Sequence, residues 1–344
     1  MGTVYRANQL SLNRPVAIKI LPPHLAANPS YVARFRQEAK AAAQLRHSHM
    51  VQIFDAGEDQ GLYYFVMELI NGETVGQRVQ RKGRLDEEST LLIGESVAAA
   101  LDYAWAQASL VHRDVKPDNI LIDSDGTVKI ADLGLAKLRD NSAKAITMAV
   151  SFVGTPHYCA PEQAKGDTDV DFRADIYALG ATLYHLVTGS PPFPETSGVS
   201  AMVKHITESI PDPMDVNPTI SESFAWLVET MMAKNKAKRY PRWEDVLTDI
   251  DGVLHHQPLT ARPLPVGAST ILRSARRKAP IRLDVEEDSS EETERSGSRF
   301  FHFFLAISAI FTVLLYVLWF GLSTHAKSHR PLPVAKPSVL QPTQ

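Results

Sequence analysis

Residues 110–134 read LVHRDVKPDNILIDSDGTVKIADLG, and the fold and the chemistry of the chain can be inferred outward from this stretch. Two short β-rich runs, ILI at 120–122 and VKI at 128–130, flank Asp125 and Gly126. Asp-Gly between apolar runs is a strong signal for a hairpin with a two-residue turn. Centred on that turn, the hairpin pairs Asn119 with Asp132, so the sequence predicts that these two side chains meet at its open end.

A carboxylate beside an amide oxygen offers two hard oxygen ligands, which Mg²⁺ prefers next to phosphates. Taken alone, the pair is better explained as an ordinary polar strand end. However, Asn119 ends the segment HRDVKPDN and Asp132 begins DLG. This context favours a magnesium site formed by Asn119 and Asp132.

Two charged residues stand where the pattern is otherwise apolar. In the helical stretch 30–47, Phe35, Ala42 and Leu45 share a face with Glu38. Lys19 lies in the strand-like run VAIKIL at 16–21. A lone charge in apolar surroundings is costly unless it is paired, so contact between Glu38 and Lys19 would satisfy both. The periodicity supports equally well a Glu38 that reaches solvent at the edge of the apolar stripe.

Composition limits the function classes. The chain has 344 residues and a net charge of -3, which gives no reason to expect nucleic acid as a partner. Cys159 is the only cysteine, which excludes an intrachain disulfide and a zinc site of several thiolates. A single thiol suits a reducing compartment.

The apolar pattern fades after about residue 257. Residues 258–299 hold a basic run and then an acidic, Ser-rich run, and we predict a disordered juxtamembrane linker there. Residues 300–322 are predicted to form a transmembrane helix, because the last 20 of them carry no charge. A buried core helix is the alternative, but flanking polar linkers leave no domain to bury it. A short Pro-rich tail, 323–344, follows.

Six motifs occur in order: VAIK, the helix glutamate, HRDVKPDN, DLG, GTPHYCAPE and DIYALG. In this set the chain, from Gly2 to about Leu254, resembles the eukaryotic-like (Hanks-type) serine/threonine protein kinases, most closely the membrane-anchored bacterial type. The resemblance implies an α+β, two-lobed protein-kinase fold over residues 1–257. A small antiparallel-sheet N-lobe would span 1–70, and a larger helical C-lobe would span 71–257.

The resemblance also implies roles for individual residues, with Mg²⁺ and ATP as the cofactors. Asp114 would accept the proton of the substrate hydroxyl, and Lys116 would steady the γ-phosphate. Asn119 and Asp132 would hold the metal. His112 would pack in the core beneath the catalytic loop.

Lys19 would hold the α- and β-phosphates and pair with Glu38. Gly2 would be the tail of a glycine-rich loop over the phosphates. The adenine slot would be lined by Val4, Ala17 and Leu121, with Met67 as gatekeeper. The backbones of Glu68 and Ile70 would read the adenine edge.

The same resemblance implies structural and regulatory positions. Asp175 would accept hydrogen bonds from the catalytic-loop backbone, and Glu162 would form a buried ion pair with Arg239. Arg113, directly before Asp114, is typical of kinases that are activated by phosphorylation of the activation loop. Thr147 is the favoured phosphosite and Ser151 the second, although an unmodified loop residue remains an alternative at either position.

The chain as written lacks the first glycines of the loop and the first strand of the N-lobe, so we expect the native start to lie upstream of Met1. The predicted function is transfer of phosphate from Mg-ATP to serine or threonine in proteins, including the chain itself. Dimerisation would permit phosphorylation in trans. The predicted location is the cell membrane, with a single pass and a cytoplasmic kinase domain. The alternatives are a membrane-tethered pseudokinase scaffold and, more distantly, a small-molecule phosphotransferase.

Overall fold

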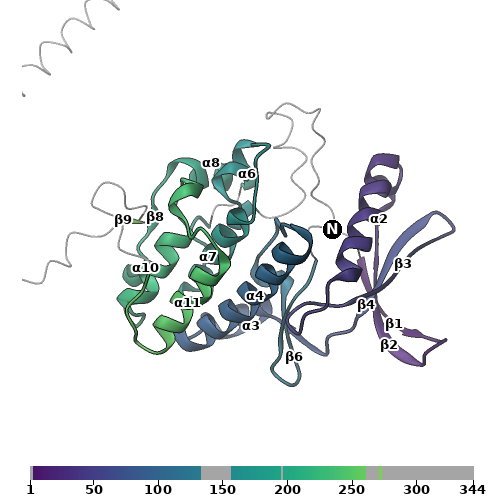
Figure 1. The fold of residues 1–344 in the computed structure, drawn as a ribbon, viewed down its shortest axis with the longest axis horizontal. Helices are drawn as coiled ribbons and strands as arrows, with labels where there is room; N and C mark the ends of the chain where they lie inside the picture. Colours follow the sequence, from purple (N-terminus) through teal and green to yellow (C-terminus); the bar gives the residue numbers. More distant parts are fainter. Residues whose placement is uncertain (1–2, 133–155, 195–196, 261–270, 273–344) are drawn as a thin grey trace, which may run out of the picture. The chain divides into compact units, whose positions relative to one another are not determined.

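The structure is a computed structural model, and it describes residues 3–132, 156–194, 197–260 and 271–272. Within these ranges the side chains of residues 30, 34, 37, 38, 271 and 272 are not described. The predicted two-lobed α+β kinase fold is present: a sheet-rich N-lobe is followed by a helical C-lobe (Figure 1).

The N-lobe is built on a four-stranded antiparallel sheet in the order β1-β2-β4-β3. Its elements are β1 (Thr3–Gln9), β2 (Arg14–Ile20), α1 (Pro23–Ala26), α2 (Pro29–Gln44), β3 (Ile53–Asp59) and β4 (Leu62–Glu68). Helix α2 packs on the sheet through Phe35, whose ring stacks on Phe65 with centroids 3.9 Å apart. Strand β1 is an edge strand: within the described ranges only β2 pairs with it.

A second antiparallel sheet, in the order β5-β6-β7, begins the C-lobe. The elements between the N-lobe and residue 132 are β5 (Gly72–Thr74), α3 (Val75–Lys82), α4 (Glu87–Ala108), η1 (Pro117–Asn119), β6 (Ile120–Asp123) and β7 (Val128–Ile130). Helix α4 begins at a cap in which Asp86 accepts a hydrogen bond from the Ser89 N–H at 2.7 Å. This cap satisfies one of the free N–H groups of the first turn.

Helix α7 is the centre of the C-lobe. The C-lobe elements after residue 155 are η2 (Pro156–Tyr158), α6 (Pro161–Lys165), α7 (Arg173–Thr188), α8 (Gly198–Thr207), β8 (Ile210–Pro211), α9 (Pro213–Val216), α10 (Glu222–Met231), η3 (Lys236–Lys238), α11 (Trp243–Leu254) and β9 (Ile271–Leu272). Almost every side chain of α7 is buried, so the helix is enclosed by other elements on all sides. Gly180 permits the close crossing with α10, since a Cβ there would lie 2.8 Å from that of Met231.

Part of the predicted linker is ordered, which corrects its boundary. The Thr260 N–H and hydroxyl both donate to the buried Asp249 of α11, at 2.7 Å each. Leu259 packs against the core, and β9 pairs in parallel with β8. Residues 258–260 and 271–272 therefore belong to the folded C-lobe, because they satisfy polar and apolar groups of α11 and β8.

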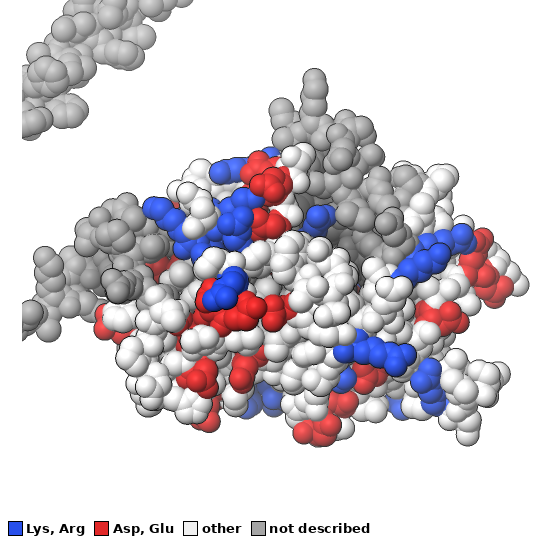
Figure 2. Space-filling view, viewed as in Figure 1, with Lys and Arg blue, Asp and Glu red and all other residues white. Residues whose placement is uncertain are grey.

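Charged side chains of the C-lobe pair locally on the surface. Figure 2 shows basic and acidic side chains next to one another over this lobe, and Lys236 lies 2.6 Å from Asp169. Arg173 likewise pairs with Asp171 at 2.6 Å. An exposed pair such as Lys236–Asp169 contributes about 0–1 kcal/mol, so the stability of the lobe depends mainly on its core.

A buried histidine in the C-lobe predicts acid sensitivity. His205 of α8 lies between the Tyr177 hydroxyl, 2.8 Å from Nδ1, and the His157 carbonyl, 2.8 Å from Nε2. Burial, and after it the charge of Lys234, lowers the pKa of His205 to about 3 from 6.5. Between pH 6.5 and about 3, His205 therefore binds a proton in the unfolded chain but not in the folded chain. The free energy of unfolding should fall as the pH drops from 6.5 towards 3.

Replacing this side chain tests the prediction. His205→Gln should reduce the loss of stability on acidification, by up to about 1.4 kcal/mol per pH unit between pH 3 and 6.5. The measurement is the unfolding free energy or midpoint of both proteins across that range. Identical pH slopes for the two proteins would contradict a depressed pKa at His205.

Candidate active site

The loop that holds His112, Arg113 and Asp114, which we call the catalytic loop, is anchored to helix α7. The backbone N–H groups of His112 and Arg113 donate to the two carboxylate oxygens of Asp175, at 2.6 and 2.7 Å. Asp175 lies in the first turn of α7 and is 1% exposed. Burial raises the pKa of its carboxyl to about 7, while the two N–H donors act in the opposite direction. The predicted role of Asp175 as the anchor of this loop is confirmed.

Two predicted catalytic residues, Lys116 and Asn119, converge on the carboxylate of a third, Asp114. Lys116 Nζ lies 3.0 Å from Asp114 Oδ2, and Asn119 Nδ2 donates to the same oxygen at 3.1 Å. Asn119 Nδ2 also donates to the Asp114 carbonyl at 2.8 Å. Lys116 and Asn119 are almost fully buried, whereas the Asp114 side chain remains 18% exposed. The loop thus fixes the orientation of a carboxylate that solvent or a substrate can still reach.

His112 is structural, as the sequence predicts. Its ring is fully buried, and Nδ1 accepts a hydrogen bond from the Asp114 N–H at 3.2 Å. Because a backbone N–H can only donate, the ring proton is on Nε2, which lies 2.9 Å from the Ala131 carbonyl. The ring therefore links the catalytic loop to the residue before Asp132.

The predicted register of the hairpin is wrong by one residue. Ile120 pairs with Ile130, and Asn119 accepts a hydrogen bond from the Ala131 N–H at 2.8 Å. The turn is closed by Asp123 and Thr127 around three residues, with Gly126 at φ +90°. A left-handed glycine at the end of a three-residue loop is the common alternative to a two-residue turn. Asn119 therefore faces Ala131, and Asp132 lies one residue beyond the last pair.

Lys19 pairs with Asp132. The Lys19 Nζ lies 2.7 Å from Asp132 Oδ2, and both side chains are partly shielded from solvent. Asp132 adopts φ +61°, a conformation that non-glycine residues seldom take and that is often found at functional sites. The predicted partner of Lys19, Glu38, lies in α2, but its side chain is outside the described residues.

The strand register brings most of the predicted adenine-slot residues onto one face of the N-lobe sheet. Ala17 pairs with Met67, and Lys19 pairs with Val4 on its other side. Opposed residues in antiparallel strands project to the same face, so these four share it. Val4 is exposed and Ala17 is buried. Ile70 follows β4 and Leu121 lies in β6, and both are partly buried.

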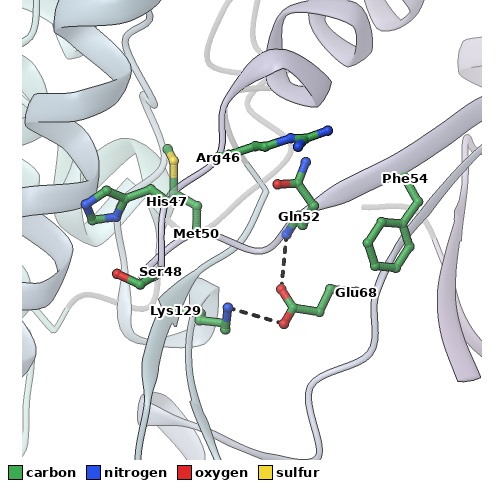
Figure 3. A pocket seen from close by; sticks show the side chains of 8 residues that line it. All are labelled: Arg46, His47, Ser48, Met50, Gln52, Phe54, Glu68 and Lys129. Atoms are coloured by element: carbon green, nitrogen blue, oxygen red, sulfur yellow. Dashed lines mark hydrogen bonds and ion pairs between the residues drawn. The ribbon is translucent and has the colours of Figure 1, made fainter.

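Glu68 points away from that face, because it follows Met67 in the strand. Its carboxylate lies 3.2 Å from Lys129 Nζ and accepts a hydrogen bond from the Gln52 N–H, also at 3.2 Å (Figure 3). The Glu68 side chain thus ties the end of β4 to β7 and to the segment before β3. Sequence reasoning missed Lys129, although a lysine between the buried Val128 and Ile130 signals a side chain on the opposite face of the strand.

The side chains at the predicted metal site fit a magnesium ion. Both side-chain hydrogen bonds of Asn119 use Nδ2, which leaves its amide oxygen for a ligand role. Asp132 supplies carboxylate oxygens beside Lys19. No group of three or more His, Cys, Asp or Glu side chains suited to a metal occurs among the described residues. This set matches Mg²⁺, which uses one or two protein oxygens together with substrate phosphates and water.

The ion pair predicted between Glu162 and Arg239 is confirmed. Arg239 Nη1 and Nη2 donate to the two Glu162 oxygens at 2.6 and 2.8 Å, a bidentate geometry. The side chain of Arg239 is 0% exposed and that of Glu162 is 8% exposed. This pair joins α6 to the segment between α10 and α11.

Several predictions lie outside the described residues. They are Gly2, the phosphosites Thr147 and Ser151, the remainder of the linker 258–299, the transmembrane helix 300–322 and the tail 323–344. Within the described ranges, no helix combines the length and the apolar character needed to cross a bilayer.

Comparison with known families gives one clear match. The model of the family described as protein kinase domain matches residues 1–256. A probable serine/threonine-protein kinase of Clostridium perfringens is 40% identical over 253 residues, 74% of this chain and 36% of that protein. The serine/threonine-protein kinase PrkC of Bacillus subtilis is 39% identical over 250 residues, 73% of this chain and 38% of that protein.

PknB of Mycobacterium tuberculosis, a serine/threonine-protein kinase, is 36% identical over 262 residues, 75% of this chain and 42% of that protein. The chain thus spans less than half the length of these relatives. The crystal structure of the PknI kinase domain of M. tuberculosis superposes with a TM-score of 0.60 at 29% identity. That superposition covers 73% of this chain and 90% of that domain.

Proposed function

This chain belongs to the protein kinase domain family, and on that premise we propose that it transfers the γ-phosphate of ATP to serine and threonine hydroxyls of proteins, its own activation loop included. The observation that carries the proposal is the convergence of Lys116 and Asn119 on the carboxylate of Asp114, in a loop anchored by Asp175. A scaffold that binds nucleotide without using it does not need this arrangement.

Asp114 acts as the general base in this proposal. Its two polar neighbours orient the carboxylate toward the hydroxyl of a bound serine or threonine, and it accepts the proton as the new bond to phosphorus forms. Lys116 carries a buried positive charge 3.0 Å from this carboxylate. It is therefore placed to neutralise charge on the transferred phosphoryl group.

Asn119 and Asp132 would hold Mg²⁺ through their side-chain oxygens. The metal supplies charge neutralisation across the phosphates and orients them for in-line transfer. With ATP bound, the Lys19 ammonium would contact the α- and β-phosphates, and the Asp132 carboxylate would be available to hold the metal. The Lys19–Asp132 contact of 2.7 Å keeps both charges compensated.

Ala17, Met67, Leu121 and Val4 form the proposed adenine slot, and the backbones of Glu68 and Ile70 read the adenine edge. We propose that phosphorylation of Thr147 activates the enzyme, with Ser151 as the second choice of phosphosite. Arg113 would then pair with the phosphate group. We also propose a single membrane-spanning helix at 300–322, a cytoplasmic kinase domain and dimerisation for phosphorylation in trans.

The proposal is tested by incubating the full chain with Mg-ATP and measuring phosphoserine and phosphothreonine by mass spectrometry. Lys19→Met should lower the rate of incorporation by about 10–100-fold, because the phosphates lose their positioning cation. Lys82→Met, at an exposed helix end, is the matched control and should leave the rate within about twofold.

A folded wild-type protein that binds ATP but incorporates no phosphate would overturn the proposed activity in favour of a scaffold. Phosphorylation of small molecules without phosphorylation of proteins would favour the phosphotransferase alternative.

A further inference from the structure

A hollow lies behind the proposed adenine slot, on the side of β4 to which Glu68 points (Figure 3). Its volume is about 420 Å³, within the range of small-molecule sites. The segment between α2 and β3, the strand ends and β7 contribute its wall: Arg46, His47, Ser48, Met50, Gln52, Phe54, Glu68 and Lys129. None of the roles proposed above for ATP or substrate uses this hollow.

The wall carries more positive than negative charge. Glu68 is already engaged by Lys129 at 3.2 Å and by the Gln52 N–H. Arg46 is exposed, and within the described part of the chain it forms no hydrogen bond or ion pair. In Figure 3 its side chain extends past Gln52, on the other side of that residue from Lys129. The hollow therefore offers one guanidinium that has no partner among the described residues, together with the electrostatic field of a second cation.

The pKa of His47, the histidine on the wall, is sensitive to the positive charge in the hollow. His47 stacks on Tyr103 of α4 with centroids 5.3 Å apart, and its ring lies 5.5 Å from that of His49. Partial burial, then the charges of His49 and Lys129, lower the pKa of His47 below its usual value. An anion in the hollow would oppose the last two effects, so the titration of His47 can detect it.

The hollow also has an apolar side. Met50 is 2% exposed, and the Phe54 ring carries the Arg14 guanidinium over it, 3.7 Å from the centroid. Arg14 covers one face of the ring, and the partly buried Phe54 lines the hollow with the rest of its apolar surface. A flat apolar group can lie on this surface while an acidic group attached to it reaches Arg46.

We propose that the hollow is a binding site for a small aromatic carboxylate, whose ring packs on Phe54 and whose anionic group pairs with Arg46. Guanidinium and carboxylate match in bidentate geometry, which gives the site its preference for a carboxylate over a neutral group. The site is open on one side, so binding is weak.

Occupancy of this site alters ATP affinity. The bound anion attracts the same Lys129 ammonium that holds Glu68, and Glu68 supplies backbone to the proposed adenine slot. A weaker Lys129–Glu68 contact removes one of the restraints on this residue, whose backbone is also held by pairing with Val16 and by the Glu68 N–H bond to the Gln52 carbonyl at 2.9 Å, and ATP should then bind somewhat less tightly. This second step rests on the proposed function, whereas binding to the hollow does not.

The test uses 2-naphthoate as the probe and the full chain as the protein, with binding followed by NMR titration. The expected Kd is on the order of 1 mM, typical of a ligand of this size. The neutral isostere 2-naphthamide should bind about tenfold more weakly or not at all. Saturating 2-naphthoate should raise the pKa of His47, whose signal is identified from its loss in His47→Asn.

Arg46→Gln should weaken 2-naphthoate about tenfold and leave phosphate transfer unchanged. Arg36→Gln removes an exposed arginine of α2 outside the hollow and should leave the Kd within about twofold. Equal binding of naphthoate and naphthamide, or equal effects of the two arginine variants, would overturn the site.

The coupling has a separate readout. Saturating 2-naphthoate should raise the Kd of ATP about two- to fivefold in the wild type and not in Arg46→Gln. An unchanged ATP affinity alongside specific naphthoate binding would overturn the coupling. Absence of phosphate transfer would overturn only the proposed kinase activity, since both binding assays are independent of turnover.

Discussion

Asp114→Asn should lower phosphate transfer by about 10²–10⁴-fold while the Kd of ATP changes by less than about twofold. The amide cannot accept the hydroxyl proton, so the chemical step loses its general base. Its oxygen can still accept the hydrogen bonds that Lys116 and Asn119 donate to Asp114 Oδ2. The geometry of the loop and the nucleotide site should therefore survive, and the loss should appear in kcat.

The matched control is Asp125→Asn, the same change of carboxylate to amide at the exposed tip of the nearby hairpin. Asp125 accepts a hydrogen bond from the Thr127 N–H at 2.8 Å, which an asparagine oxygen can also do. Its transfer rate should equal that of the wild type within about twofold. An Asp114→Asn protein that keeps a third or more of the wild-type rate would refute the role of Asp114 as base.

The long-range contacts of the site were predictable only because the motifs resemble those of a known family. Nothing in periodicity places Asp175 against the N–H groups of His112 and Arg113, or Arg239 against Glu162. The resemblance implied both contacts, and the structure confirms them. The resemblance also implied the roles of Asp114, Lys116 and Asn119, which fall within a single loop and lie together in the structure.

The hairpin shows where local reasoning fails. Asp125-Gly126 signals a turn, but the choice between a two- and a three-residue loop depends on how the flanking strands twist and pack. Here His49 of the segment before β3 accepts from the Ile130 N–H and binds the Val128 carbonyl, so β7 is fixed by a distant segment. That tertiary contact selects the register, and one residue of shift changes which side chain faces Asn119.

Ion pairs between distant strands were equally beyond the sequence. The Lys19–Asp132 and Lys129–Glu68 pairs each join the N-lobe to the β6–β7 hairpin. A charged residue in an apolar strand indicates that a partner exists but not which one. Contact between Glu38 of α2 and Lys19 therefore remains a prediction.

Arg239→Met should destabilise the C-lobe by about 3–5 kcal/mol, the cost of leaving one buried charge without its partner. The Glu162 carboxylate would lose both guanidinium bonds. The carbonyls of Ala233 and Arg173, which accept from Arg239 at 2.8 Å each, would also lose their donor. The melting temperature of the full chain should fall by about 6–20 °C for an unfolding unit of this size.

Glu162→Gln is the informative comparison. It leaves the Arg239 guanidinium its carbonyl partners and one side-chain oxygen, so its effect should be smaller than that of Arg239→Met. The double variant should lose less unfolding free energy than the sum of the two single losses, because the second change removes a group that the first has already left without a partner. Additive losses, or a drop below about 3 °C for Arg239→Met, would mean that the pair does not hold the lobe together.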